Sequence, residues 1–179
     1  MGRIAVAMYL TLDGVMEAPA WTMPYWEEQL SDFQDMAQKD ADALLLGRVT
    51  YQQFAAAWPD SPDEGAAYMN GIGKFVPTST LKEPAWNARF IKKDALAEIG
   101  RLRDAKRLLV YGSGQLVRAL FQAGLVDEYR EMVFPLIAGK GKKLFQGASG
   151  SRAFSLLSSQ STKKGVLLNV YRPQPGGMR

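Results

Sequence analysis

The chain begins with the pattern of a buried strand followed by a helix. Residues 4–10 form a continuous apolar run, which is typical of a central strand buried on both faces. From Pro24 onward, apolar residues recur at helical spacing at Trp26, Leu30, Phe33 and Ala37. Because proline is favoured at the first position of a helix, this pattern predicts a helix that begins at Pro24.

The same alternation of strand and helix repeats as far as residue 124. Short apolar runs predict strands at residues 43–46, 75–76, 89–91 and 107–111. Apolar residues at helical spacing predict helices over residues 51–58 and 116–121, and a short helix that ends at Gly71. A further helix is expected to run from an Asp94 cap to Arg103, and Gly124 is expected just past the end of the helix at 116–121.

After residue 124 the helical pattern stops. Residues 128–137, 154–161 and 166–172 each predict a strand. Strands that alternate with helices indicate a parallel sheet, and the closing run of strands indicates an antiparallel edge. No long linker or internal repeat divides the sequence, so we expect one α/β domain over residues 1–179, with residues 173–179 as a peripheral tail.

The composition narrows the possible chemistry, because the chain has no cysteine and no histidine. These absences exclude a disulfide framework, a thiolate nucleophile, a Ser-His pair and any zinc site that needs either residue. A Mg²⁺ or Ca²⁺ site made of carboxylates alone is still allowed, but no metal site is predicted. If the chain is an enzyme, we expect a cofactor to supply the reactive group.

Charge is divided unevenly along the chain, whose net charge is +4. Residues 1–70 hold three basic and eleven acidic side chains, a net of −8, whereas residues 71–179 hold nineteen basic and seven acidic ones, a net of +12. Such asymmetry is compatible with nucleic-acid binding, or with two halves that attract each other around an anionic ligand. Basic runs are no longer than the pair Lys142-Lys143 and no aromatic residues interleave with them, so no nucleic-acid partner is predicted.

The start of the chain shows no targeting pattern. The apolar run at 4–10 is too short to span a membrane, and it lacks the basic region and cleavage site of a signal peptide. We therefore expect a cytoplasmic protein with no membrane partner.

Three predicted strands lead into turns of similar chemistry, at residues 46–50, 78–81 and 111–115. In an open α/β sheet, ligands bind outside the carboxyl ends of the strands. Glycine lets a phosphate approach the backbone, and the free N–H groups at a helix start favour an anion. Each turn also has a plainer explanation as a tight turn or a helix cap. Together the three turns favour a phosphate-bearing ligand.

Individual side chains in these turns suit an anion as well. Arg48 can make a forked, charge-assisted contact, and Ser79 and Thr80 offer hydroxyl groups. The Gly112-Ser113-Gly114 segment is not an ordinary Rossmann fingerprint, because Val117 stands where the third glycine belongs.

Two further groups have a functional and a structural interpretation. Asp13, just past the first strand, can orient substrate or relay a proton, or it can simply form an Asp-Gly turn. Trp21, Tyr25 and Trp26 can stack on a planar ligand, or they can close the core beneath a loop. The sequence leaves both alternatives open.

The segment at residues 45–51 resembles the glycine-arginine-x-threonine segment of the dihydrofolate reductase superfamily. The resemblance is closer to the reductase domain of bacterial riboflavin biosynthesis and its small stand-alone relatives. Supporting segments follow in family order over nearly the whole chain, at residues 11–14, 74–81, 110–114, 125–129 and 135–141.

This resemblance implies a three-layer, mostly parallel, doubly wound sheet that binds NADPH. It implies that the phosphates of the adenine half are held by Gly47, Arg48, Thr50, Ser79 and Thr80. It places the pyrophosphate and nicotinamide side against Gly112, Ser113, Gly114 and Gln115, with Thr11 and Leu12 flanking the nicotinamide. An arginine that meets a 2′-phosphate, as Arg48 would, favours NADPH over NADH.

One departure from the family pattern changes the expected substrate. Folate reductases carry a carboxylate on the first helix a few residues before a phenylalanine, and anchoring on Phe33 puts Gln29 at that position. The neighbouring Glu28 is offset by about 100° around a helix, so folate reduction is not expected. The riboflavin-pathway reductase is usually fused to a deaminase, whose zinc needs His and Cys, and this chain has neither.

We therefore expect an NADPH-dependent reductase of a small heterocyclic substrate, pteridine-like or aminopyrimidine-like. Asp13 is the candidate catalytic group, and Trp21 and Trp26 are the candidate substrate-pocket residues. The alternative is a nucleotide- or flavin-binding protein without turnover. The family also implies a homodimer in which the late strands pack across a two-fold axis.

Overall fold

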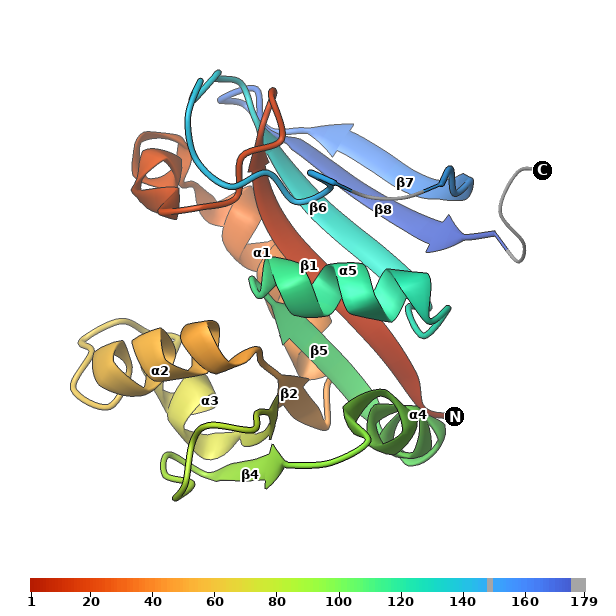
Figure 1. Ribbon diagram of the computed structural model, residues 1–179. Helices are drawn as coiled ribbons and strands as arrows, with labels where there is room; N and C mark the ends of the chain where they lie inside the picture. The colour runs from red at the N-terminus through yellow and green to blue at the C-terminus, as the bar shows by residue number, and fades with distance from the viewer. Residues whose placement is uncertain (148–149, 175–179) are drawn as a thin grey trace.

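The computed structural model describes residues 1–147 and 150–174, which form one mixed, eight-stranded sheet. The strands lie in the order β4-β3-β2-β5-β1-β6-β8-β7 (Figure 1). Their bounds are β1 (Arg3–Thr11), β2 (Ala43–Leu45), β3 (Gly73–Pro77), β4 (Ala88–Ile91), β5 (Arg107–Tyr111), β6 (Glu128–Phe134), β7 (Phe154–Ser161) and β8 (Leu167–Pro173). The pairs from β4 to β6 are parallel, and β8 is antiparallel to both of its neighbours.

Helices cover both faces of this sheet. They are α1 (Glu28–Lys39), α2 (Arg48–Ala57), α3 (Ala66–Gly71), α4 (Ala95–Ala105) and α5 (Gly114–Gln122). Alternate residues of β1 face opposite layers: Ile4 and Val6 pack with α4 and α5, whereas Ala5 packs with α1, α2 and α3. Figure 1 shows α5 in front of the sheet and α1 behind it. The predicted three-layer, doubly wound sheet with antiparallel C-terminal strands is confirmed.

The central strands end at different heights along the sheet. β5 ends at Tyr111, which pairs with Ala7 in the middle of β1, while β1 continues along β6 until Thr11 pairs with Phe134. The turn after β5 therefore lies beside the middle of β1 rather than beside its end. As a result, α5, which follows this turn, begins beside the middle of β1.

Several predicted boundaries are wrong for local reasons. Pro24 does not begin α1 but lies inside a short 3₁₀ helix, Pro19–Tyr25, and α1 starts only at Glu28. β6 stops at Phe134 instead of residue 137, because Pro135 has no N–H with which to continue the ladder.

Two predicted helix ends have different outcomes. Asp94 occupies the cap position of α4 in a left-handed conformation, but its side chain makes no capping hydrogen bond. Gly124 is confirmed just past α5, where its φ of 67° suits glycine. Within the predicted 173–179 tail, Pro173 belongs to β8, Gln174 donates from its backbone to Ala153, and residues 175–179 lie outside the described part of the chain.

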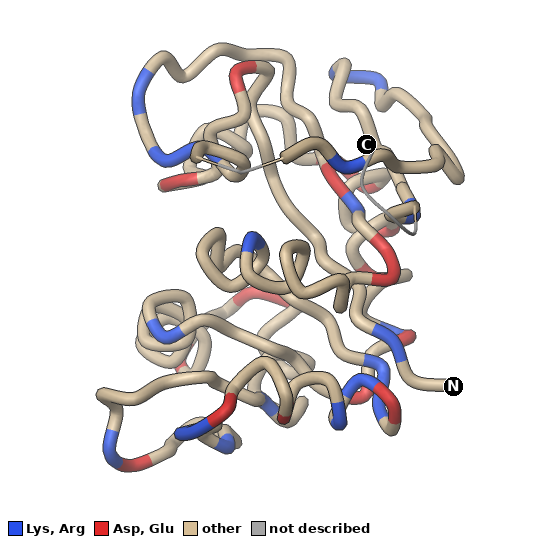
Figure 2. The backbone as a smooth tube through the Cα atoms, turned by 45° about the vertical axis from the view of Figure 1, so that its right-hand side comes forward, with Lys and Arg blue, Asp and Glu red and all other residues tan. Residues whose placement is uncertain are grey.

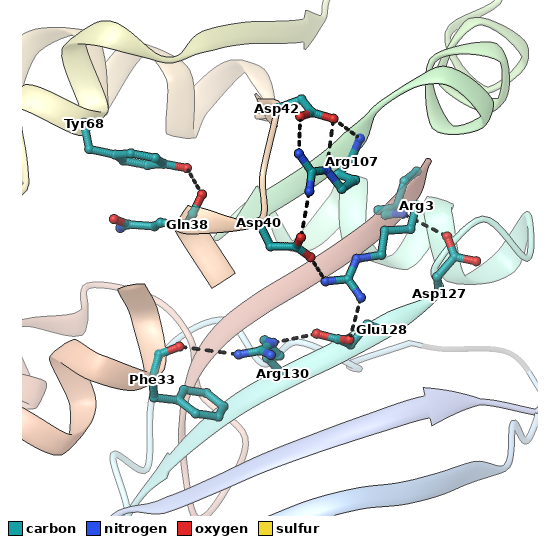
Figure 3. Close-up of polar contacts among 11 residues, drawn as sticks. Arg3, Phe33, Gln38, Asp40, Asp42, Tyr68, Arg107, Asp127, Glu128 and Arg130 are labelled. Atoms are coloured by element: carbon teal, nitrogen blue, oxygen red, sulfur yellow. Dashed lines mark hydrogen bonds and ion pairs between the residues drawn. The ribbon is translucent and has the colours of Figure 1, made fainter. Parts of the chain in front are cut away.

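Ion pairs connect the acidic first part of the chain to the basic second part at the amino edge of the sheet. The connected side chains are Asp42, Arg107, Asp40, Arg3, Glu128 and Arg130 (Figure 3). The Arg107 guanidinium lies 2.7 Å from the Asp42 carboxylate and 2.9 Å from that of Asp40. Near the N-terminus, Figure 2 shows basic and acidic positions close together. The charge asymmetry thus corresponds to contacts within one fold.

A buried lysine binds the carbonyl groups at the C-terminal end of α3. Lys74 of β3 is 2% exposed, and its Nζ donates hydrogen bonds to the carbonyls of Met69 and Ile72, the latter at 2.7 Å. The ammonium group also lies 3.9 Å from the centre of the Trp86 ring. Burial disfavours the charged form and lowers the pKa of Lys74 to about 8.

Candidate functional site

Four turns lie in a row along the carboxyl edge of the sheet. They follow the adjacent parallel strands β3, β2, β5 and β1, and they comprise residues 78–81, 46–50, 111–115 and 11–14. Segments far apart in the sequence are therefore neighbours at the edge where open α/β sheets bind ligands. The sequence-predicted cofactor residues all belong to these turns.

Ser113 joins two of the turns directly. Its Oγ accepts a hydrogen bond from the backbone N–H of Gly47 at 2.8 Å and donates one to Thr50 Oγ1 at 2.9 Å. The approach is close, because a Cβ atom at Gly47 would lie 3.2 Å from the Ser113 side chain and one at Gly112 would lie 3.4 Å from Thr50 Oγ1. The φ of 54° at Gly112 also favours glycine. The hydroxyls of Ser113 and Thr50 thus hold the two turns together.

The same two turns bring the starts of α2 and α5 to one place. Neither Gly47 nor Ser113, the residues that precede these helices, caps its own helix with a side chain. The N–H groups of both first turns are therefore available to an anion. Arg48, the first residue of α2, is exposed, and its guanidinium donates to Gln52 Oε1 at 3.0 Å. This arrangement suits the phosphates of a nucleotide.

The turn after β3 is organised by Thr78, whose role the sequence interpretation missed. Thr78 Oγ1 accepts hydrogen bonds from the backbone N–H groups of Thr80 and Leu81, at 3.3 and 3.2 Å. Ser79 and Thr80 are left exposed. Lys92 reaches this turn from the end of β4 and donates to the Leu81 carbonyl. A threonine just before two polar residues is a recognisable turn signal, whereas the Lys92 contact depends on strand order.

The carboxylate of Asp13 is fully engaged by its surroundings. It accepts hydrogen bonds from Thr11 Oγ1 at 2.6 Å and from the backbone N–H groups of Ala138 and Gly139, each at 3.0 Å. These donors lower the pKa of Asp13 to about 2, so the group is ionised at neutral pH. This geometry favours the turn interpretation. A proton-relay role stays a prediction, and the lowered pKa argues against it.

Backbone hydrogen bonds also join residues 12–18 to residues 138–144. Val15 forms an isolated antiparallel bridge with Lys143, and the backbone N–H of Met16 donates to the Lys142 carbonyl at 2.9 Å. The Thr11 hydroxyl, besides its bond to Asp13, accepts from the Val15 N–H at 3.0 Å. Leu12 is 60% exposed on the outside of the turn. The two loops therefore act as one unit beside the end of β1.

Met16 brings this unit onto the start of α5. A Cβ atom at Gly114 would lie 2.7 Å from the Met16 sulfur, so only glycine leaves room for the side chain. The thioether consequently covers the first turn of α5, next to the exposed Gln115. Because methionine is flexible, its side chain can be displaced by a ligand. The sequence held no signal for this contact.

The aromatic residues proposed for the substrate pocket pack against the sheet. The Trp21 ring lies 5.3 Å from that of Phe134, and the Trp26 ring lies 5.9 Å from that of Tyr9, both edge to face. Trp26 Nε1 donates to Ser31 Oγ at 3.1 Å. These contacts favour the interpretation that the tryptophans close the core. Their role in binding substrate stays a prediction.

A small cavity of about 10 Å³ lies between α1 and the middle of the sheet. It is lined by Ala7, Met8, Tyr9, Phe33, Gln34, Ala37, Tyr111, Arg130 and Met132. Tyr9 donates a hydrogen bond to Gln34 Oε1. No carboxylate is among these lining residues, because Glu28, Asp32 and Asp35 of α1 are exposed. Gln29, which the resemblance sets at the carboxylate position of folate reductases, accepts a hydrogen bond from the backbone N–H of Lys163 at 3.2 Å.

Comparison with protein families places the chain in a known group. The family model of the RibD C-terminal domain matches residues 3–168. The chain belongs to the RibD C-terminal domain family. Among its relatives are two uncharacterized Bacillus subtilis proteins: YyaP, 26% identical over 94% of each chain, and YwjB, 25% identical over 85% of each.

Solved structures share the fold at low sequence identity. A pyrimidine reductase-like protein from Corynebacterium diphtheriae superposes with a TM-score of 0.72, at 13% identity, over 98% of this chain and 93% of its own. The deaminase/reductase of Thermotoga maritima gives 0.70 at 16% identity, over 97% of this chain and 57% of its own. Dihydrofolate reductase from Enterococcus faecalis, complexed with NADP(H), gives 0.64 at 16% identity, over 97% of this chain and 98% of its own. The RibD-type domain therefore has the dihydrofolate reductase-like fold.

Proposed function

We propose that this RibD-type domain is an NADPH-dependent reductase that transfers a hydride to a small heterocyclic substrate, pteridine-like or aminopyrimidine-like. The observation that supports it most is the joining of two uncapped helix starts by Ser113, with Arg48 at the first position of α2. Family membership and the fold shared with a reductase complexed with NADP(H) agree with this proposal.

The residues present suit each part of NADPH. Gly47, Arg48 and Thr50 with Ser79 and Thr80 would hold the adenine-side phosphates, since this part of the edge combines free helix N–H groups with an exposed guanidinium. The segment from Gly112 to Gln115 would back the pyrophosphate, once Met16 moves off Gly114. When bound, NADPH supplies the hydride.

The chain itself would orient the reactants at the end of β1. Thr11 and Leu12 lie at the end of β1, the strand next to β5, at the place proposed for the nicotinamide. Asp13 keeps this turn attached to residues 138 and 139 through its three hydrogen bonds. We therefore assign Asp13 a positioning role. Its proton-relay role stays a prediction, which the pH dependence of turnover tests.

Two measurements test the proposal. NADPH titration, followed by quenching of tryptophan fluorescence, tests cofactor binding, and oxidation of NADPH with a panel of pteridines, flavins and quinones tests turnover. We expect binding and turnover with at least one member of the panel. Binding without turnover across the panel favours the alternative, a nucleotide- or flavin-binding protein without catalysis. No binding at millimolar NADPH contradicts both the cofactor and the activity.

We also propose that two copies associate through β7. This edge strand carries no charged residue, and its side chains are largely exposed, including Leu156 at 56% and Leu157 at 45%. Charged residues commonly protect edge strands, and their absence suits antiparallel pairing with a second copy across a two-fold axis. Light scattering should give a dimer for the native chain and a monomer for Leu156→Asp. A native monomer at high concentration contradicts this proposal.

The part of the chain that the structure describes has no helix with the length and apolar character needed to cross a membrane. A cytoplasmic location stays a prediction.

A further inference from the structure

The side chain of Tyr111 lies between the proposed cofactor turn and the small cavity next to α1, which we call the α1 cavity. Its hydroxyl group has an unusual environment. Tyr111 is the last residue of β5 and immediately precedes Gly112. The residue is 7% exposed, and its hydroxyl has no hydrogen-bond partner among the described residues. The Gln38 side chain is close enough to counteract part of the rise in the pKa of Tyr111, but it is not a hydrogen-bond partner of the hydroxyl. Buried hydroxyls without a partner are uncommon in native proteins, and such a group calls for a water or a ligand.

The surroundings indicate what kind of atom completes this site. Burial raises the pKa of Tyr111 well above its ordinary value, so the phenol keeps its proton and can donate a hydrogen bond. The neighbouring Tyr9 and Gln34 are bonded to each other. Two of the five N–H groups of Arg130 donate, one to Glu128 at 2.6 Å and one to the Phe33 carbonyl at 3.4 Å. Among the described residues that line the cavity, the Tyr111 hydroxyl is the fully buried donor without an acceptor.

The size of the cavity limits what enters it. A volume of about 10 Å³ is close to the space needed for one water molecule. It therefore suits a single exocyclic atom and not a ring. The lining contains the Arg130 guanidinium and no carboxylate, so it disfavours a cationic amino group, although the Asp35 carboxylate acts on Tyr111 from the exposed side of α1.

We propose that the Tyr111 hydroxyl donates a hydrogen bond to a carbonyl oxygen of the substrate, and that the α1 cavity admits this one atom. The inference rests on the proposed reductase function, because it places the carbonyl next to the turn that backs the cofactor. It assigns the site a neutral, carbonyl-bearing substrate in preference to an amino-substituted, cationic one. Tyr111 is then a specificity-determining residue.

The test compares Tyr111→Phe with the matched control Tyr129→Phe. The Tyr129 hydroxyl is also buried and has no hydrogen-bond partner in the described ranges, but Tyr129 belongs to the cluster on the α4–α5 side of the sheet. The probes are 2-pyridone and 2-aminopyridine, which have the same ring and differ in a carbonyl or an amino group. Binding of each probe is measured by ligand-observed NMR, with and without NADPH, and NADPH affinity is measured separately.

We expect Tyr111→Phe to weaken 2-pyridone binding about fivefold, the effect of one neutral hydrogen bond. It should leave 2-aminopyridine and NADPH binding unchanged, and Tyr129→Phe should bind 2-pyridone as the native chain does. We also expect Tyr111→Phe to melt at the same or a higher temperature, because the hydroxyl loses no hydrogen bond to the part of the chain that the structure describes.

Three results would overturn the inference. They are no binding of 2-pyridone to the native chain, equal weakening of both probes, and a lowered melting temperature of Tyr111→Phe with unchanged 2-pyridone binding. The last result would indicate a permanently bound water as the partner of Tyr111. If the native chain fails to bind NADPH while the probes still discriminate without it, the cofactor proposal fails and the carbonyl site stands.

Discussion

Replacing Ser113 with alanine should destabilise the fold, because one hydroxyl joins the two turns of the proposed cofactor site. The change removes the acceptor of the Gly47 N–H at 2.8 Å and the donor to Thr50 Oγ1 at 2.9 Å. At about 1 kcal/mol for each hydrogen bond, we expect a loss of about 2 kcal/mol in the free energy of unfolding. For a chain of this length, that lowers the melting temperature by about 4–8 °C.

Urea unfolding without cofactor measures this loss, and NADPH titration shows whether cofactor affinity falls with it. Ser113→Gly is the informative companion, because glycine also lacks the hydroxyl but relieves the left-handed backbone at φ 60°. It should therefore lose less stability than the alanine variant, by about 1 kcal/mol. Ser151→Ala, at an exposed serine outside any strand, is the control and should be neutral. If Ser113→Ala unfolds like the native chain, the two turns are not held by this hydroxyl.

Two further predictions concern pH dependence. The folded pKa of Asp13, about 2, lies below its unfolded value of about 4, so its contribution is present above pH 4 and is lost as pH falls toward 2. Asp13→Ala should accordingly unfold at lower urea than the native chain at neutral pH, and a gap that persists near pH 2 would contradict the assignment. For Lys74, the folded pKa of about 8 lies below the unfolded value of about 10.4, so between these values the unfolded chain binds more protons and native stability rises with pH. Relative to Lys74→Met, the native chain should gain stability from about pH 7.5 to about pH 9.5, and a constant difference would argue against a buried ammonium.

Much of the architecture could be predicted from periodicity, because the central strands are short, continuous apolar runs. The apolar run around Ile4–Val6 and the glycines that follow β1, β2 and β5 mark the order of elements along the chain. The predicted turns do follow neighbouring parallel strands at the same edge of the sheet, although β1 ends further along than β5. Boundaries failed where tertiary contacts decide them, as at Pro24, which lies in a segment whose aromatic residues pack on Phe134.

The candidate site was less accessible to sequence reasoning. Glycine, arginine and hydroxyl residues mark the turns, but their partners come from other strands. The bond from Gly47 to Ser113 and the contact of Met16 with Gly114 have no local pattern. The isolated hydroxyl of Tyr111 was hidden for a similar reason, because a tyrosine at the end of an apolar run looks like any core residue.

In the proposed function, the carboxyl edge of the sheet binds NADPH and the Arg48 guanidinium binds the 2′-phosphate. Isothermal titration of NADPH and NADH into the native chain and Arg48→Ala tests this claim most directly. Arg48 is exposed, and within the described part of the chain its side chain hydrogen-bonds only to Gln52, so the variant should fold normally. We predict that the native chain prefers NADPH, and that Arg48→Ala weakens NADPH binding by about tenfold or more while NADH binding changes little. Equal losses for both nucleotides, or no binding of either to the native chain, would contradict the account.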